Sequence, residues 1–320
     1  MVIKKKILVC GATGFIGRNI AESFSKNDNY EVTGVHNKRP TYNCPNLKWI
    51  KADLTNSEDI ARVVKGMDVI IQAAATTSGS KDIVARPYIH VTDNAVMNSL
   101  LFRTAFEYKV KHVIFFSCTV MLQSSEKPQD EESYDSSLEL HPRYFGVGHT
   151  KLYIEKMCDF YSRIGEIKFT AIRHTNIYGP HDKFDLEKSH VFGATITKVL
   201  NSKDGKINVW GSGEEERDLL YVDDLTSFVE KAIENQKKPY ALFNCGYGAP
   251  ISIKNLVNKI INASGKKLII EHDLTQPTIK TSLSLDCGKA ERELGWTPKT
   301  STDEGITKTI AWWRENVTVD

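Results

Sequence analysis

Short apolar runs alternate with longer amphipathic stretches along the first half of the chain. Runs typical of buried strands occupy residues 6–10, 30–35, 47–52, 69–73, 113–117 and 168–173. Between them, apolar residues recur at three- and four-residue spacing, most clearly over 83–107 and 146–164, as in helices that pack on a sheet. This alternation predicts parallel strands joined by right-handed crossovers, and hence an α/β fold with a doubly wound parallel sheet.

The pattern changes after Tyr178, where Gly, Pro, Asp and Lys become frequent and the strands become short. Helices are predicted over residues 191–202, 224–235, 252–264 and 303–316, and the apolar run 241–245 is expected to return to the main sheet. We therefore expect a large lobe over residues 1–175 and a smaller, interleaved α/β lobe over 176–320. Ligands of such sheets bind outside the carboxyl ends of the strands.

Composition narrows the classes of function. The 320 residues include 42 Lys and Arg against 40 Asp and Glu, so the net charge of +2 disfavours a nucleic-acid partner. No apolar run reaches the ~18–20 residues that a membrane span needs, so we expect no membrane partner. The six cysteines are scattered, without CxxC pairs or His/Cys clusters at metal-ligand spacing, which predicts a reducing cytoplasm and no metal site.

A glycine-rich turn follows the first predicted strand directly and opens a helix. Residues 11–17 read Gly-Ala-Thr-Gly-Phe-Ile-Gly, a G-x-x-G-x-x-G spacing. The first glycine permits the sharp turn, the second lets the backbone approach a pyrophosphate, and the third allows close packing of helix on sheet. This position predicts a Rossmann-type dinucleotide site rather than a turn without a ligand.

The end of the second strand bears on the type of cofactor. An NAD site usually has a carboxylate there for the ribose hydroxyls, but this chain has His36-Asn37-Lys38-Arg39. These cations, assisted by Arg18, favour the 2′-phosphate of NADP, with NAD as the alternative. Asp53 is a candidate acceptor for the adenine amine. The predicted cofactor-binding residues are Gly11, Thr13, Gly14, Phe15, Ile16, Gly17, Asn37, Lys38, Arg39, Asp53, Leu54, Ala73, Ala74 and Lys151.

Further motifs extend along nearly the whole chain. They are Gln72-Ala73-Ala74-Ala75, Ser117-Cys118-Thr119-Val120, Asn176-Ile177-Tyr178-Gly179-Pro180, Arg217-Asp218 before Tyr221-Val222-Asp223-Asp224-Leu225, and Leu294-Gly295-Trp296-Thr297-Pro298. With them the chain resembles the extended short-chain dehydrogenase/reductase family of nucleotide-sugar enzymes. Residues 176–184, followed by Ser189-His190-Val191, are most similar to the GDP-L-fucose synthases of that family, whereas residues 277–286 look like general epimerases and dehydratases.

The resemblance implies hydride transfer at C4 of a nucleoside-diphosphate sugar, GDP first, with a UDP- or dTDP-sugar 4-epimerase or dehydratase as the alternative. It implies that Ser117 binds the C4 oxygen and that Lys151 binds the cofactor ribose. The family's proton-shuttling tyrosine stands four residues before the lysine, where this chain has Val147. Tyr144 lies two turns before Lys151 and is a candidate substitute.

Valine has no proton to give, so three interpretations of the chain stay open: an enzyme that uses water or another acid, a silent binding paralogue, or a chain inactivated at this position. Thr119 occupies the place of the family's cysteine base, and Cys118 would point to the opposite face of a strand. His190 matches the family's acid.

The resemblance also assigns substrate binding to Ser117, Asn176, His190, Arg217 and Lys280. It further implies a homodimer that pairs the helices near 92–108 and 148–163 in a four-helix bundle. The side chains expected in its seam are Leu100, Leu101, Phe102, Met157 and Phe160, with packing of these side chains on their own sheet as the alternative.

Overall fold

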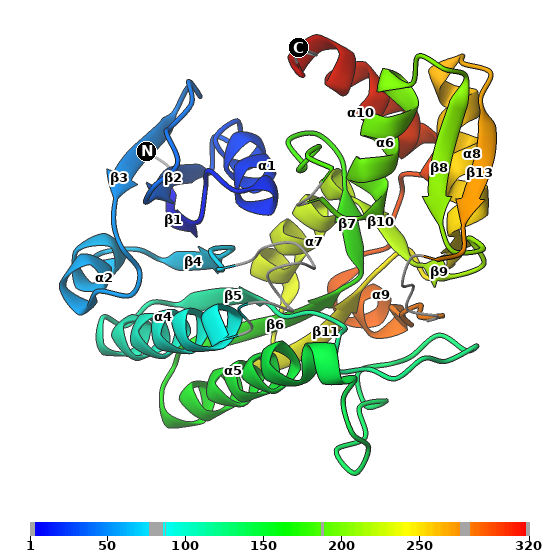
Figure 1. Cartoon of the computed structure of the whole chain (residues 1–320). Helices are drawn as coiled ribbons and strands as arrows, with labels where there is room; N and C mark the ends of the chain where they lie inside the picture. The colour runs from blue at the N-terminus through cyan, green and yellow to red at the C-terminus, as the bar shows by residue number, and fades with distance from the viewer. Residues whose placement is uncertain (1–3, 77–85, 87, 187–188, 276–281, 318–320) are drawn as a thin grey trace.

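A twisted sheet of seven parallel strands forms the centre of the molecule (Figure 1). The computed structural model describes residues 4–76, 86, 88–186, 189–275 and 282–317. The strand order is β11-β6-β5-β4-β1-β2-β3, which confirms the predicted doubly wound arrangement. The strands are β1 (Lys5–Cys10), β2 (Tyr30–His36), β3 (Leu47–Lys51), β4 (Val69–Gln72), β5 (His112–Phe116), β6 (Lys168–His174) and β11 (Tyr240–Cys245).

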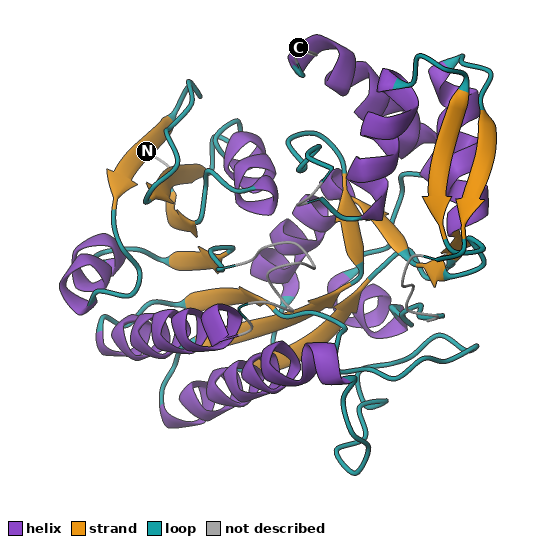
Figure 2. Cartoon of the chain, in the orientation of Figure 1, coloured by secondary structure: helices purple, strands orange, loops and turns teal. Residues whose placement is uncertain are grey.

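Helices cover both faces of this sheet (Figure 2). One face packs against α1 (Phe15–Phe24), α7 (Val222–Asn235) and α9 (Gly288–Leu294), and the other against α2 (Ser57–Val64), α4 (Tyr88–Glu107) and α5 (Phe145–Ile164). The inner strands between them are almost wholly buried, because a sheet covered on both faces has little surface left for polar side chains, whereas in the edge strand β3 only Leu47 is buried. Sequence periodicity missed α2 and α9, which have only eight and seven residues.

The smaller lobe has its own apolar core. It contains α6 (Val191–Asn201), α8 (Ile253–Ser264) and α10 (Thr302–Asn316). Its short strands pair as β7 (Asn176–Tyr178) with β10 (Leu219–Tyr221), β8 (Lys206–Trp210) with β13 (Ile269–Asp273), and β9 (Glu216–Arg217) with β12 (Ile251–Ser252). A 3₁₀ turn, η1 (Pro142–Tyr144), precedes α5. The one returning strand expected, β11, joins the main sheet, and the helices α7 and α9 from the second half of the chain also pack on that sheet. The two lobes are therefore more interleaved than predicted.

Three chemical features of the described residues complete the picture. No helix among them is long and apolar enough to cross a membrane. The six cysteines are all free thiols. Within the same ranges, no three His, Cys, Asp or Glu side chains come together in a way that could hold a metal ion.

Candidate active site

The glycine-rich turn has the geometry that a bound phosphate requires. Gly11 is left-handed with φ of +75°, and a Cβ there would lie 2.7 Å from the backbone of Ala74. A Cβ on Gly17 would collide with the carbonyl oxygen of Gly11. Gly14 is the N-cap of α1 and provides no side-chain cap, so the first N–H groups of that helix remain available to a ligand. Thr13, Phe15 and Ile16 complete this first turn.

Two residues after β4 close the other side of this turn. Ala73 donates its backbone N–H to the carbonyl of Cys10 at 3.1 Å, and Ala74 donates its own to the Gln72 side chain at 3.4 Å. Both alanines are half-buried and border Gly11, where a larger side chain would fill the approach to the turn.

The adenosine end lies beyond β2 and β3. Lys38 and Arg39 are exposed. Hydrogen bonds from Thr55, with a smaller contribution from Asn37, lower the pKa of Asp53, so the carboxylate is ionised and linked to the loop after β2. Leu54 is buried, with its side chain in the core under α2.

Arg18 lies at the same end of the crevice. Its guanidinium stands 4.0 Å over the Tyr42 ring and pairs with Glu22 at 2.7 Å. Arg18 is therefore held at the start of α1 beside the turn, where its charge faces the region of a bound phosphate.

Lys151 belongs to α5, and its ammonium lies at the carboxyl end of β5. Its ammonium donates to the carbonyl oxygen of Phe116 at 2.7 Å, and burial lowers its pKa. Val147, at the position predicted for the family's tyrosine, is half-buried one helical turn earlier on the same face of α5.

Ser117 follows β5 at the expected place, but its hydroxyl is engaged inside the fold. It donates to the Glu155 carboxylate at 2.6 Å, and only 2% of the residue is exposed. Glu155 also receives two hydrogen bonds from Arg173, at 2.8 and 3.1 Å. A buried ion pair that joins α5 to β6 therefore holds the hydroxyl that the sequence assigned to the substrate.

Cys118 is the next residue and behaves differently from expectation. Strand alternation put it on the face away from Thr119, but β5 ends at Phe116, and Thr119 lies in a turn whose carbonyl accepts the N–H of Leu122 at 3.0 Å. Burial raises the pKa of the Cys118 thiol, and the Lys151 ammonium partly opposes this rise. The thiol is thus close enough to Lys151 to interact with its charge.

His174 is a site residue that sequence reasoning missed. It ends β6, and its Nδ1 donates to the carbonyl of Thr175 at 2.8 Å, which leaves Nε2 as the acceptor nitrogen of the neutral ring. Burial lowers its pKa to about 4, and the charges of Lys151 and His190 add to this. Its place at the carboxyl end of a predicted strand was the available signal.

His190 is the N-cap of α6, without a side-chain capping bond. Desolvation of its ring and the nearby Lys183 ammonium lower its pKa. The structure thus gathers Lys151, Cys118, His174 and His190 around one region of the crevice.

The predicted substrate residues line the smaller lobe. Burial lowers the pKa of the Arg217 guanidinium, while the nearby Tyr144 and Glu215 partly offset this shift. Tyr144 ends η1 and is near enough to Arg217 to interact with its charge. Asn176 begins β7, with its backbone N–H on the carbonyl of Asp218 at 3.2 Å. Lys280 lies outside the described residues.

Comparison with known proteins identifies the family to which the chain belongs. The model of the NAD dependent epimerase/dehydratase family matches residues 7–246, most of the chain. The chain belongs to that family. The family assignment makes the cofactor of the glycine-rich turn a nicotinamide dinucleotide.

Several relatives match almost end to end. A GDP-L-fucose synthase of Sinorhizobium fredii is 27% identical, over 98% of this chain and 96% of the relative. A GDP-L-colitose synthase of Yersinia pseudotuberculosis is 26% identical, over 96% and 97%. The structure of UDP-glucose 4-epimerase from Thermotoga maritima, with UDP-glucose, superposes with a TM-score of 0.87 at 24% identity, over 98% of this chain and all of that one. This last likeness confirms the fold.

Proposed function

We propose that the chain is an NADP-dependent epimerase or reductase that acts at C4 of a nucleoside-diphosphate sugar, with GDP as the first candidate base. The observation that carries this proposal is the intact glycine turn opposite a Lys151 that is anchored on the end of β5. The two GDP-sugar synthases among the full-length relatives support the choice of base. Lys38 and Arg39, without an acid at the end of β2, support NADP over NAD.

The cofactor would be held by the residues of the glycine turn, by Asp53 and the cations after β2, and by Lys151. When bound, a nicotinamide dinucleotide supplies hydride transfer. The residues fit it, because a Cβ on Gly11 or Gly17 would collide with neighbouring backbone, so only glycines allow this tight turn at the uncapped N-terminal end of α1. Lys151 would orient the nicotinamide ribose, since its ammonium is fixed by the carbonyl of Phe116.

Proton transfer to and from the sugar oxygen needs a group other than Val147. His174 is neutral near pH 7 and has Nε2 as its acceptor nitrogen, so we assign it as acceptor of the hydroxyl proton when the sugar is oxidised; in the reverse reduction, Nε2 first takes a proton from solvent and then passes it to the ketone oxygen. His190 would serve as the second proton-transfer group. Arg217 would bind the substrate diphosphate, because its planar fork matches phosphate oxygens, with Tyr144 and Asn176 beside it.

A second candidate function is a binding protein that recognises dinucleotide and sugar nucleotide without turnover. Two observations favour it: Val147 stands in the tyrosine position, and the Ser117 hydroxyl is engaged by Glu155 instead of facing the crevice. The geometry of cofactor binding is the same for both candidates, so only turnover separates them.

The deciding experiment compares the chain with Val147→Tyr and Val147→Phe. The measurements are NADPH binding by fluorescence and NADPH oxidation with GDP-4-keto-6-deoxymannose and UDP-sugars. The tyrosine variant should exceed the phenylalanine variant by about 10²–10⁴-fold in kcat, since only its ring has an acidic hydroxyl. Turnover by the unmodified chain that His174→Phe abolishes would support the assigned acceptor. Cofactor binding without turnover in all three proteins would favour the binding protein.

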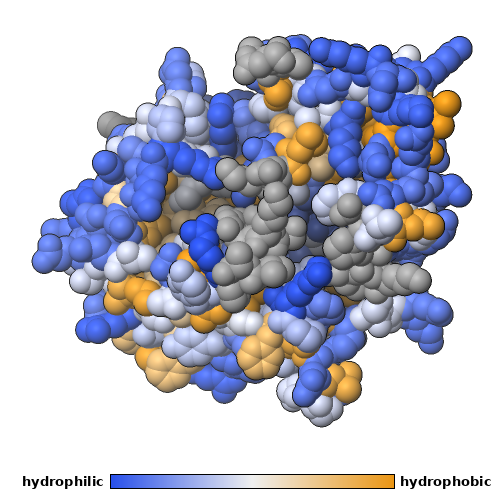
Figure 3. Space-filling model, viewed as in Figure 1, coloured by the Kyte–Doolittle hydropathy of each residue, from blue (hydrophilic) through white to orange (hydrophobic). Residues whose placement is uncertain are grey.

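We also propose a cytoplasmic homodimer that pairs α4 and α5 of two copies. Tyr153, Phe160 and Ile164 lie along one face of α5 and are about half exposed, and Figure 3 shows hydrophobic side chains over this part of the surface. Two side chains expected in the seam, Leu101 and Phe102, are instead fully buried in the chain's own core. That correction moves the predicted seam to the outer face of α5, and sedimentation of Phe160→Glu would test it.

A further inference from the structure

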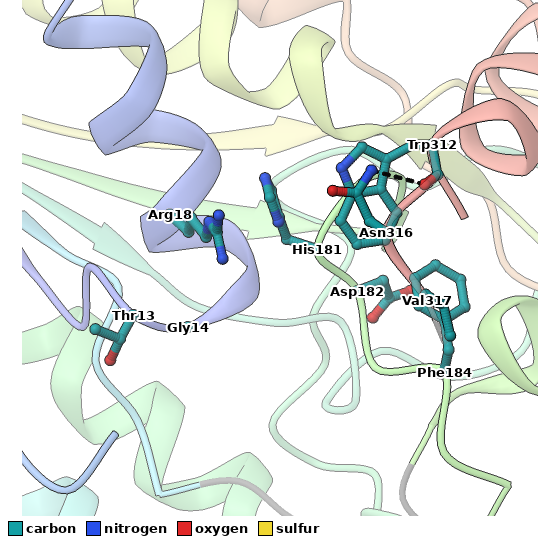
Figure 4. A pocket seen from close by; sticks show the side chains of 9 residues that line it. All are labelled: Thr13, Gly14, Arg18, His181, Asp182, Phe184, Trp312, Asn316 and Val317. Atoms are coloured by element: carbon teal, nitrogen blue, oxygen red, sulfur yellow. Dashed lines mark hydrogen bonds between the residues drawn. The ribbon is translucent and has the colours of Figure 1, made fainter. Parts of the chain in front are cut away.

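A cavity of about 420 Å³ opens between the glycine-rich turn and the smaller lobe. Gly14 and Arg18 line one wall. Asp182 and Phe184, from the loop after β7, line the other together with Trp312 at the end of α10. Figure 4 shows His181 lying between Arg18 and Trp312, so the two walls approach each other across this ring. The cavity is therefore built jointly by both lobes.

The first wall is positively polarised. The N-terminal end of α1 presents uncapped N–H groups at Gly14, and the Arg18 guanidinium lies on the same wall, paired with the Glu22 carboxylate. Glu22 bonds both Arg18, at 2.7 Å, and His181, at 3.2 Å. Burial alone would raise the pKa of Glu22, but these two partners lower it to about 2. The ionised carboxylate therefore links Arg18 to His181 and stabilises this wall.

The second wall contains a buried carboxyl group with an unused oxygen. Oδ1 of Asp182 accepts the N–H of Lys183 at 2.7 Å, whereas Oδ2 is buried without a hydrogen-bond partner in the described part of the chain. Burial raises the pKa of Asp182 to about 7, against the N–H and ammonium of Lys183. A buried oxygen without a partner is costly, and a ligand in the cavity would satisfy it.

The charged and titratable groups around Asp182 are few. Arg18 and Glu22 face it from α1, and His181 and Lys183 belong to its own loop. The end of α10 contributes to the wall only the uncharged Trp312, Asn316 and Val317. A cation would be repelled by the opposite wall, whereas an oxyanion suits that wall and could also accept a hydrogen bond from a protonated carboxyl.

We propose that this cavity binds a phosphate group of the dinucleotide cofactor between the N-terminal end of α1 with Arg18 and the protonated carboxyl of Asp182, which donates a hydrogen bond to a phosphate oxygen. The inference rests on the proposed function. Binding then takes up one proton from solvent, and the ionised carboxylate repels the ligand at higher pH. The same contact joins the lobes where Asn19 already donates to the carbonyl of Pro180 at 2.9 Å.

The test measures binding of NADH by the full chain between pH 5.5 and 9, by calorimetry in two buffers of different ionisation enthalpy. NADH lacks the 2′-phosphate, which itself titrates near about pH 6. The dissociation constant should rise above pH 7, approaching about tenfold per pH unit, with proton uptake on binding. Asp182→Asn, whose amide donates at every pH, should bind without this pH dependence and without proton uptake, while the exposed-site control Asp185→Asn should behave as the unmodified chain.

Two results would overturn the inference: pH-independent NADH binding by the unmodified chain, or unchanged proton uptake in Asp182→Asn. NADPH, inorganic pyrophosphate and GDP are tested in parallel. If neither NADH nor NADPH binds but pyrophosphate shows the Asp182-dependent pH effect, the cavity is a phosphate site and the proposed function fails. If GDP alone shows it, the phosphate belongs to the substrate and the assignment to the cofactor is wrong. If none of these probes binds, both proposals fail.

Discussion

The glycine-rich turn after β1 and the junction of β5 with α5 lie at the same edge of the sheet, but they are built from different parts of the chain. At the turn, a Cβ on Gly11 or Gly17 would collide with neighbouring backbone, so the shape of the main chain defines the site. At the junction, Val147 stands at the position predicted for the family's tyrosine, and the Ser117 hydroxyl is bonded to Glu155. A site built from backbone shape tolerates the exchange of many side chains, whereas a site built from individual side chains changes its chemistry with each one.

The largest expected effect is a loss of stability at the junction of β5 with α5. Glu155→Ala leaves the Arg173 guanidinium and the Ser117 hydroxyl buried without their partner, and removal of one member of a buried pair costs about 3–5 kcal/mol. Urea unfolding should show this loss in the free energy of unfolding. The exposed pair of Arg163 with Asp159 on the same helix is the control, and Asp159→Ala should cost less than about 1 kcal/mol. Equal losses would mean that the buried network does not hold the junction.

The next effect concerns the turn. Gly11→Ala adds a Cβ 2.7 Å from the backbone of Ala74, so the turn must shift, and a shift that costs cofactor binding about 1–3 kcal/mol weakens affinity roughly 5- to 150-fold. Gly66→Ala is the matched control, because Gly66 has φ of +77° with nothing near its Cβ position. Titration with NADPH measures both variants. The same weakening in both would indicate a general loss of stability instead of a blocked cradle.

A smaller effect concerns the pH dependence of the free energy of unfolding, to which the buried His112 contributes. Burial, with lesser contributions from Lys168 and Lys5, lowers the pKa of His112 from 6.5 to about 3. The unfolded chain therefore binds more protons, and stability falls as pH drops below 6.5, by up to about 1.4 kcal/mol per pH unit. His112→Gln should flatten the slope of unfolding free energy between pH 6.5 and 4.5, above the range in which Glu22 titrates. The exposed His149→Gln should leave it unchanged.

The smallest effect tests Tyr144. If the phenol of Tyr144, which interacts with the charge of Arg217, donates a hydrogen bond to the same diphosphate, Tyr144→Phe should weaken substrate binding by about 0.5–1.5 kcal/mol, roughly 2- to 10-fold in KM, and leave kcat nearly unchanged. Steady-state kinetics of an active form, the unmodified chain or Val147→Tyr, measure this split. A large fall in kcat alone would instead identify Tyr144 as the proton donor, and the junction would then use a tyrosine hydroxyl for proton transfer.

The sequence by itself determined the doubly wound sheet, the glycine-rich turn and the position of Lys151. These follow from periodicity and from residue types within a few positions of one another, which local sterics and burial control. Only the tertiary structure decided where the side chains at the junction point. Ser117 is directed by Glu155 and Arg173, which stand 38 and 56 positions further along, and Asp182 is buried by α10 more than a hundred residues away. Such pairings depend on which charges and cavities the folded chain brings together, and no local pattern records them.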